Sequence, residues 1–128
     1  MQRHLCPLIL GILLIGCALS SPASTRLWTG SVSPDWHTAG NWDSNAVPDV
    51  GDEVTVPAGA TILLAAPTAN LGAFTMNGGI LVFTNWGTRL QAQNIALQGG
   101  TVTLPTAYRI DQMSNRVWIV CSNDFTLN

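Results

Sequence analysis

The chain is 128 residues long, with 47% hydrophobic and 9% charged side chains and a formal net charge of −2 at pH 7. This length allows one domain at most. Seven acidic against five basic side chains leave no basic patch of the kind that binds phosphate backbones, so we expect no nucleic-acid partner.

The N-terminal segment, residues 1–16, is predicted to be the signal peptide of a lipoprotein. A short basic head is followed by the apolar run 5–15, which is shorter than the ~20 residues that a membrane-spanning helix needs. The run closes with Leu14-Ile15-Gly16-Cys17, which resembles a bacterial lipobox. That resemblance implies cleavage before Cys17 and lipidation of its thiol. The alternatives are an ordinary signal peptide cut between residues 18 and 23, or a short membrane anchor.

A lipid on Cys17 would make the membrane a partner of the chain, because two or more acyl chains anchor a protein stably. The following residue is Ala18 and not aspartate, which by the same resemblance favours the outer membrane. Residues 17–25 are mostly small and polar and are predicted to be a flexible tether. We therefore expect a protein that is exported and lipid-anchored at the cell surface.

Residues 26–52 are predicted to form an ordered but irregular cap that tryptophans hold in place. Trp28, Trp36 and Trp42 are interleaved with glycine, proline and asparagine, and no helical or strand period continues beyond residue 30. Packing is the more common use of such rings, and we expect it for Trp28 and Trp42.

Two tryptophans are candidate platforms for a sugar, because exposed indole rings can stack on apolar sugar faces. Trp36 lies in the most polar part of the cap, beside His37, and Trp86 lies in an Asn-Trp-Gly turn. His37 is the one histidine after the signal segment, and a single histidine makes neither a catalytic triad nor a zinc site. The candidate ligand-binding residues are therefore Trp36, Trp86 and His37, with polysaccharide as the candidate partner.

The stretch 53–128 is organised as a repeat. Phe74–Phe83 aligns with Ile95–Leu104 without a gap at an offset of 21 residues, so that one Gly-Gly pair falls on another. Glycine-hinged units at a fixed period are typical of stacked rungs. Looser copies precede and follow the aligned pair, with Val54-x-Val56 and Ile62-Leu63-Leu64 before it and Val117-x-Ile119 and Phe125-x-Leu127 after it.

Each unit is predicted to contain two short strands, because its apolar residues lie two apart. No apolar stripe of helical spacing follows the signal segment, and the β-branched and glycine content disfavours helices. The expected strands lie at about 54–56, 61–64, 71–76, 79–84, 93–97, 100–104, 107–110 and 116–121. The chain is thus predicted to be all-β, as a β-solenoid with the tryptophan cap at its N-terminal end. A small β-sandwich or barrel is the alternative.

Two groups of motifs resemble known surface proteins. Trp28-Thr29-Gly30, Gly40-Asn41-Trp42 and residues 47–52 are similar to the N-terminal segment of bacterial surface β-helix proteins, including autotransporter-type passengers. Residues 51–59 with Phe74–Phe83 resemble the eight-glycine domain, which precedes β-helices in fibrocystin-like and cell-surface hyaluronidase proteins. The resemblance implies an extracellular right-handed β-helix, or its N-terminal cap, that faces polysaccharide. Such proteins run for hundreds of residues, so we expect the rungs of this chain to be incomplete.

The acidic side chains do not mark out a catalytic or metal site. Asp49, Asp52 and Glu53 could bind Ca²⁺ through their oxygens, but acids beside a strand start more often cap turns. Asp111 and Asp124 could form a glycosidase pair across a groove, although nothing singles them out. We expect no catalytic residue, no metal and no cofactor.

The cysteines exclude a disulfide framework. Cys6 would leave with the signal peptide and Cys17 would carry lipid, so Cys121 has no partner within the chain. We expect Cys121 to be a small buried side chain on an apolar strand.

Taken together, these features predict a cell-surface lipoprotein with a structural or adhesive β-helix-like domain that contacts carbohydrate and is not an enzyme. Two alternatives remain open. The chain could be the N-terminal fragment of a polysaccharide-degrading β-helix enzyme that lacks its catalytic rungs, or a freestanding sugar-binding module.

Overall fold

The computed structural model describes residues 22–106 and 114–128, and this part of the chain is all-β. The predicted signal peptide 1–16, the lipidation site Cys17, the predicted strand 107–110 and Asp111 lie outside the described residues. No helix within the described residues is long and apolar enough to cross a membrane. The one helical element there is a short 3₁₀ turn, η1 (Ala39–Asn41).

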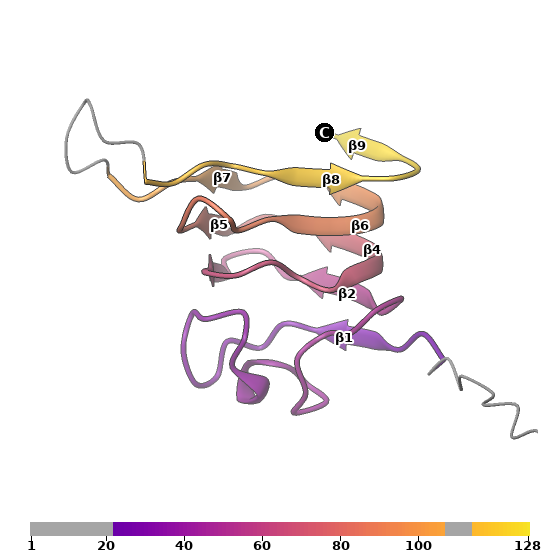
Figure 1. Cartoon of the computed structure of the whole chain (residues 1–128). Helices are drawn as coiled ribbons and strands as arrows, with labels where there is room; N and C mark the ends of the chain where they lie inside the picture. Colours follow the sequence, from indigo (N-terminus) through magenta and orange to yellow (C-terminus); the bar gives the residue numbers. More distant parts are fainter. Residues whose placement is uncertain (1–21, 107–113) are drawn as a thin grey trace, which may run out of the picture.

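Two sheets make up the fold, and all pairs between their strands are parallel. The larger sheet has the order β1-β2-β4-β6-β8, with β9 also paired to β6, and the smaller sheet has the order β3-β5-β7. Figure 1 shows the strands stacked in chain order, from β1 at one end to β8 and β9 at the other. The strands are β1 (Thr25–Leu27), β2 (Glu53–Val56), β3 (Thr61–Leu64), β4 (Asn70–Met76), β5 (Ile80–Phe83), β6 (Leu90–Leu97), β7 (Thr101–Thr103), β8 (Ile119–Cys121) and β9 (Phe125–Leu127).

The repeat read from the sequence sets the register of the central strands. Phe74 of β4 pairs with Ile95 of β6, and Leu81 of β5 pairs with Val102 of β7. Both pairs have the predicted offset of 21 residues. The all-β class, with parallel sheets, is therefore confirmed. Two sheets that share one hydrophobic cluster are also compatible with the small β-sandwich that was the alternative.

The core consists of alternate residues of the strands, because successive side chains of a strand point to opposite faces. β2, β3 and β5 each have an exposed, buried, half-buried, buried pattern. Full burial of one such aliphatic or aromatic side chain contributes about 1.5–3 kcal/mol. The cluster includes the buried pairs Val54 and Val56, Phe74 and Met76, Ile95 and Leu97, Ile62 and Leu64, and Leu81 and Phe83.

β4 and β6 bend in the middle, where the regular alternation of buried and more exposed residues is interrupted. Leu71 and Phe74 are both buried although they lie three residues apart. β6 has two consecutive exposed residues, Gln93 and Asn94, at the equivalent position. This bend explains why β6 pairs with two later strands, β8 along its first half and β9 along its second half.

Two kinds of connection join the strands. We call the connections 57–60, 77–79 and 98–100 the short corner, because each contains only a few residues and a glycine. We call 65–69, 84–89 and 104–118 the variable corner, because these connections differ in length. The parallel pairing of the strands is maintained in spite of that difference.

Three element boundaries differ from the sequence prediction. The predicted tether 17–25 is wrong at its end, because Thr25 begins β1 and the Ser24 N–H donates to the Asp52 carboxylate at 3.0 Å. β6 begins at Leu90 and not at residue 93, since Leu90 is buried and pairs with β8. β8 begins only at Ile119, after residues that belong to the variable corner.

Candidate functional site: the tryptophan cap and the variable corner

The three tryptophans of the cap lie in the core. Trp28, Trp36 and Trp42 are 3%, 0% and 2% exposed. Trp42 meets the other two edge to face, with ring centroids 5.0 Å from Trp28 and 4.7 Å from Trp36, an arrangement that aromatic pairs prefer. The Trp42 indole N–H donates to the Trp36 carbonyl oxygen at 2.9 Å. The predicted packing role of Trp28 and Trp42 is confirmed.

The prediction of an exposed Trp36 is wrong. Its ring lies against Phe74 of β4, with centroids 6.1 Å apart, and offers no face to a sugar. Polar neighbours in the sequence suggested exposure, but the backbone of Asp35 and Trp36 pairs with Leu63 of β3 and turns the indole inward. The Trp36 indole N–H is buried without a hydrogen-bond partner among the described residues.

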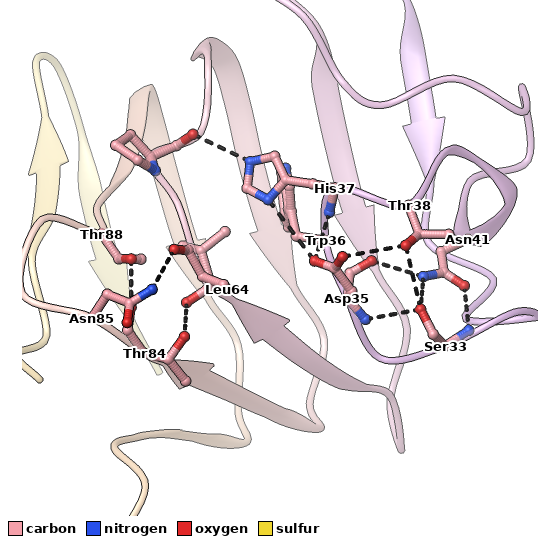
Figure 2. A network of polar contacts seen from close by, with 12 residues as sticks. Ser33, Asp35, Trp36, His37, Thr38, Asn41, Leu64, Thr84, Asn85 and Thr88 are labelled. Carbon is pink, nitrogen blue, oxygen red and sulfur yellow. Dashed lines mark hydrogen bonds and ion pairs between the residues drawn. The ribbon is translucent and has the colours of Figure 1, made fainter.

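Asn41 is the organising polar residue of the cap, and nothing in the sequence singled it out beyond the Gly-Asn-Trp motif. It is fully buried, and its side-chain oxygen accepts from the Val32 and Ser33 N–H groups at 2.9 and 2.8 Å. Its amide donates to the Ser33 hydroxyl and to the Asp35 carbonyl oxygen at 3.0 and 2.7 Å. Figure 2 shows this network beside Trp36. All hydrogen-bonding positions of the amide group are thereby used.

His37 lies on the surface of the cap, as predicted. Its Nε2 is 3.3 Å from the Pro67 carbonyl oxygen, and its Nδ1 is 3.9 Å from the Asp35 carboxylate. Figure 2 shows His37 between the cap and the variable corner. The ring therefore links the two regions, and sugar contact by His37 remains a prediction.

Of the two tryptophans predicted as sugar platforms, Trp86 stays accessible, since 52% of it is exposed. It lies in the variable corner, where Asn85 has a positive φ of 70° and donates from its side chain to the Ala65 carbonyl oxygen at 2.8 Å. The Arg116 guanidinium lies over the Trp86 ring, with its carbon 4.9 Å from the centroid. The sequence did not indicate this contact.

The carboxylate of Asp52 joins the cap to the strands. It accepts from the Ser24 N–H, from Nε of Arg26 at 2.8 Å and from the Asp49 N–H at 3.0 Å. Burial raises the pKa of Asp52, but the hydrogen bonds from Asp49, Arg26 and Ser24 and the charge of Arg26 together lower the pKa below its usual value. Both oxygens thus accept from N–H donors, which fits the turn-capping role.

The remaining candidate groups do not come together. In the described parts of the chain, no three His, Cys, Asp or Glu side chains are close enough to hold a metal. Cys121 is half-buried, and its thiol donates to the Gln93 and Asp124 carbonyl oxygens at 3.3 and 3.1 Å. Full burial of Cys121 was predicted and is corrected, because β8 is an edge strand of the larger sheet.

Comparisons with known proteins identify relatives of this chain. A family model described as the G8 domain matches residues 41–119. The human protein Fibrocystin-L is 34% identical over 80 residues, which covers 58% of this chain and 2% of that protein. No solved structure gives a significant match.

These findings correct the relationship expected from the sequence. They give the G8 domain and a human relative in place of a bacterial surface β-helix protein with an eight-glycine or autotransporter-type segment behind a lipoprotein signal. They are consistent with a surface or extracellular location. The chain spans only 2% of the length of the relative, so nothing about that whole protein transfers directly.

Proposed function

Because the chain belongs to the G8 domain family, we propose that it is a structural domain of a cell-surface or extracellular protein, in which the cap closes one end of a β-solenoid. The proposed role is non-catalytic. The observation that carries the proposal is the difference between the two ends of the sheets. Among the described residues, the cap covers one end and the other end exposes apolar side chains.

The connectivity supports a solenoid. Parallel neighbours cannot be joined by hairpins, so the chain must cross over before it returns to the same sheet. From β2 to β8, successive strands alternate between the two sheets, and each new strand lies beside the previous strand of its own sheet. Nearest-neighbour stacking of this kind is characteristic of repeat proteins.

The cap covers the edges of the first strands. The Leu63 N–H of β3 donates to the Pro34 carbonyl oxygen at 2.7 Å, and the Trp36 N–H donates back to the Leu63 carbonyl oxygen at 3.0 Å. On the larger sheet, the Asp43 N–H donates to the Leu27 carbonyl oxygen of β1 at 3.0 Å. Unpaired edges of this kind would otherwise invite association with another chain.

The opposite end presents apolar side chains to solvent. Val117, Phe125 and Leu127 are 43%, 49% and 72% exposed. Together with Leu97 and Ile119 they line an apolar groove of about 330 Å³. Further parallel strands stacked on β7, β8 and β9 would cover these side chains, which supports the role of the domain as the first part of a longer stack.

Substitution of Asn41 tests the cap. Asn41→Ala leaves two partly buried N–H groups and a carbonyl oxygen without their partners, so we expect a loss of about 2 kcal/mol in the free energy of unfolding. The loosened cap should also expose the edge of β3 and cause association. Urea denaturation and light scattering at increasing protein concentration measure the two effects.

The matched control is Asn94→Ala, since Asn94 is an exposed asparagine with one long bond of 3.4 Å to the Gly72 carbonyl oxygen. We expect this change to alter stability by no more than about 0.5 kcal/mol. A monomeric Asn41→Ala variant of unchanged stability would show that the segment does not act as a cap.

We also propose carbohydrate contact as a second role, favoured by the exposed ring of Trp86 on the variable corner. Loss of glycan binding in Trp86→Ala would support this role. The Trp86 ring does not belong to the hydrophobic core, so its contact with a sugar would be an adhesive function separate from the structural role of the domain.

Membrane attachment through a lipid on Cys17, with an outer-membrane location, is a separate proposal that depends on the sequence motif alone. We expect Cys17→Ser to abolish labelling of the expressed full chain by an alkyne-tagged fatty acid, while Cys121→Ser leaves labelling unchanged. Normal labelling of Cys17→Ser would rule out this attachment.

A further inference from the structure

We propose that four side chains on the variable corner, Trp86, Arg89, Arg116 and Trp118, form a binding site for an acidic saccharide, one that carries carboxylate or sulfate groups. The inference deepens the proposed carbohydrate contact and rests on it. It is independent of the structural role of the domain.

The four side chains alternate as indole, guanidinium, indole, guanidinium. Arg116 lies between the two tryptophans, with its guanidinium carbon 4.9 Å from the Trp86 centroid and 4.0 Å from the Trp118 centroid. Arg89 lies 5.3 Å from the Trp118 centroid. The attraction between a guanidinium and the face of an indole holds the guanidinium planes in place.

Hydrogen bonds fix the two segments that carry these side chains. The Leu90 N–H donates to the Trp118 carbonyl oxygen at 3.0 Å, which places Arg89 beside Trp118, each directly before one of the paired strands β6 and β8. The Asn85 N–H donates to the Asn115 side-chain oxygen at 2.6 Å, and Nε of Arg116 donates to the Trp86 carbonyl oxygen at 2.7 Å. A site that is ordered before binding loses less entropy when the ligand arrives.

Arg89 and Arg116 are positively charged and carry N–H donors that an anionic ligand could use. Within residues 22–106 and 114–128, the ion pair that involves an arginine joins Arg26 to Asp52. In the same residues, no carboxylate lies within 4.0 Å of Arg89 or Arg116. Among the same residues, the terminal nitrogens of Arg116 and the whole guanidinium of Arg89 have no hydrogen-bond acceptor. Most acidic residues of the described chain lie in the cap and at the start of β2.

The combination of groups indicates the class of ligand. A guanidinium presents a planar fork of N–H groups that matches the oxygens of a carboxylate or sulfate. An exposed indole packs against the apolar face of a sugar ring. Trp86 supplies the exposed indole, the Arg116 guanidinium lies over that ring, and the Arg89 guanidinium lies over Trp118. A nucleic acid also combines rings with oxyanions, but its binding depends on many Lys and Arg contacts to phosphates, and this cluster contains two arginines.

Calorimetric titration of the full chain with three polymers tests the site: polygalacturonate for carboxylate, dextran sulfate for sulfate, and neutral dextran. We expect one or both acidic polymers to bind, with affinity that falls as salt rises, and neutral dextran to bind at least about tenfold more weakly. Arg116→Gln and Trp86→Ala should each weaken binding about tenfold, and Arg89→Gln with Arg116→Gln should abolish it. Unfolding midpoints of the variants should match that of the parent chain.

Phe125→Ala is the matched control, because Phe125 is a 49% exposed aromatic residue on β9, outside the corner. It should bind the acidic polymers as the parent chain does.

Unchanged binding by the double arginine variant would overturn the inference. If neutral dextran binds as well as the acidic polymers and only Trp86→Ala weakens that binding, the proposed carbohydrate contact stands and the proposed preference for an acidic ligand is wrong. If no polymer binds, both are wrong and the structural role remains. If single-stranded DNA binds with the same dependence on the arginines, the saccharide assignment is overturned.

Discussion

Replacing Gly79 with alanine is expected to destabilise the domain by about 3–4 kcal/mol. Gly79 has a φ of +87°, which costs an L-residue about 1–2 kcal/mol. An added Cβ would also overlap the carbonyl oxygen of Ala60 on the preceding turn of chain. That oxygen accepts from the Ile80 N–H at 2.8 Å and cannot move away freely, and overlap of this kind costs about a further 1–3 kcal/mol.

Gly59 is the matched control for this substitution. Its φ of +79° is close to that of Gly79, but an added Cβ there meets no atom within 4 Å. Gly59→Ala should therefore cost only the conformational strain of about 1–2 kcal/mol. Urea denaturation of the two variants separates the effect of backbone strain from that of atomic overlap. Equal losses of stability would contradict the close approach of Gly79 to the turn that contains Ala60. If Gly79→Ala does not fold at all, soluble Gly59→Ala still gives the expected contrast.

The second large effect is expected at Asp52, whose replacement by asparagine should cost about 3 kcal/mol near neutral pH. Breaking a buried ion pair leaves an uncompensated charge, here on Arg26, whose side chain is only 19% exposed. Both carboxylate oxygens accept from N–H donors, so the amide nitrogen of an asparagine must face at least one donor. Asp43→Asn is the control, since Asp43 is exposed and accepts only from the Leu27 N–H.

The effect of Asp52 should depend on pH in a defined direction. Because the pKa of Asp52 is lowered on folding, its contribution to stability is complete above the usual aspartate pKa and is lost as the pH falls through the lower value. The stability of the parent chain should therefore decline below about pH 4, and its advantage over Asp52→Asn should shrink in the same range. An advantage that stays constant down to pH 2 would contradict the lowered pKa.

The strands and their register could be predicted because they depend on local patterns. Apolar residues two apart identify strands, and the Gly-Gly pairs mark the short corner where successive turns of chain meet. Gly100 repeats the arrangement of Gly79, with an added Cβ only 2.5 Å from the Gly79 carbonyl oxygen. The 21-residue offset is thus the spacing at which one glycine packs on the backbone of another.

The direction of the Trp36 side chain could not be predicted because a distant strand determines it. Its neighbours Asp35 and His37 are polar and suggest an exposed loop. The pairing with Leu63 and the contact with Phe74 turn the ring inward, and neither residue is near in sequence. The arginine and tryptophan contacts of the variable corner escaped prediction for the same reason, since the register of β6 with β8 brings Arg89 to Trp118.

The unequal lengths of the variable corner have a consequence for how such domains can diverge. The connections 65–69, 84–89 and 104–118 differ, yet the strands on either side keep their parallel partners. Added residues there leave the interior of the domain unchanged, whereas the connections of the short corner vary only between three and four residues. Insertions and deletions between relatives should therefore accumulate on one side of the molecule. That side can acquire or lose a ligand in the course of evolution without a new fold.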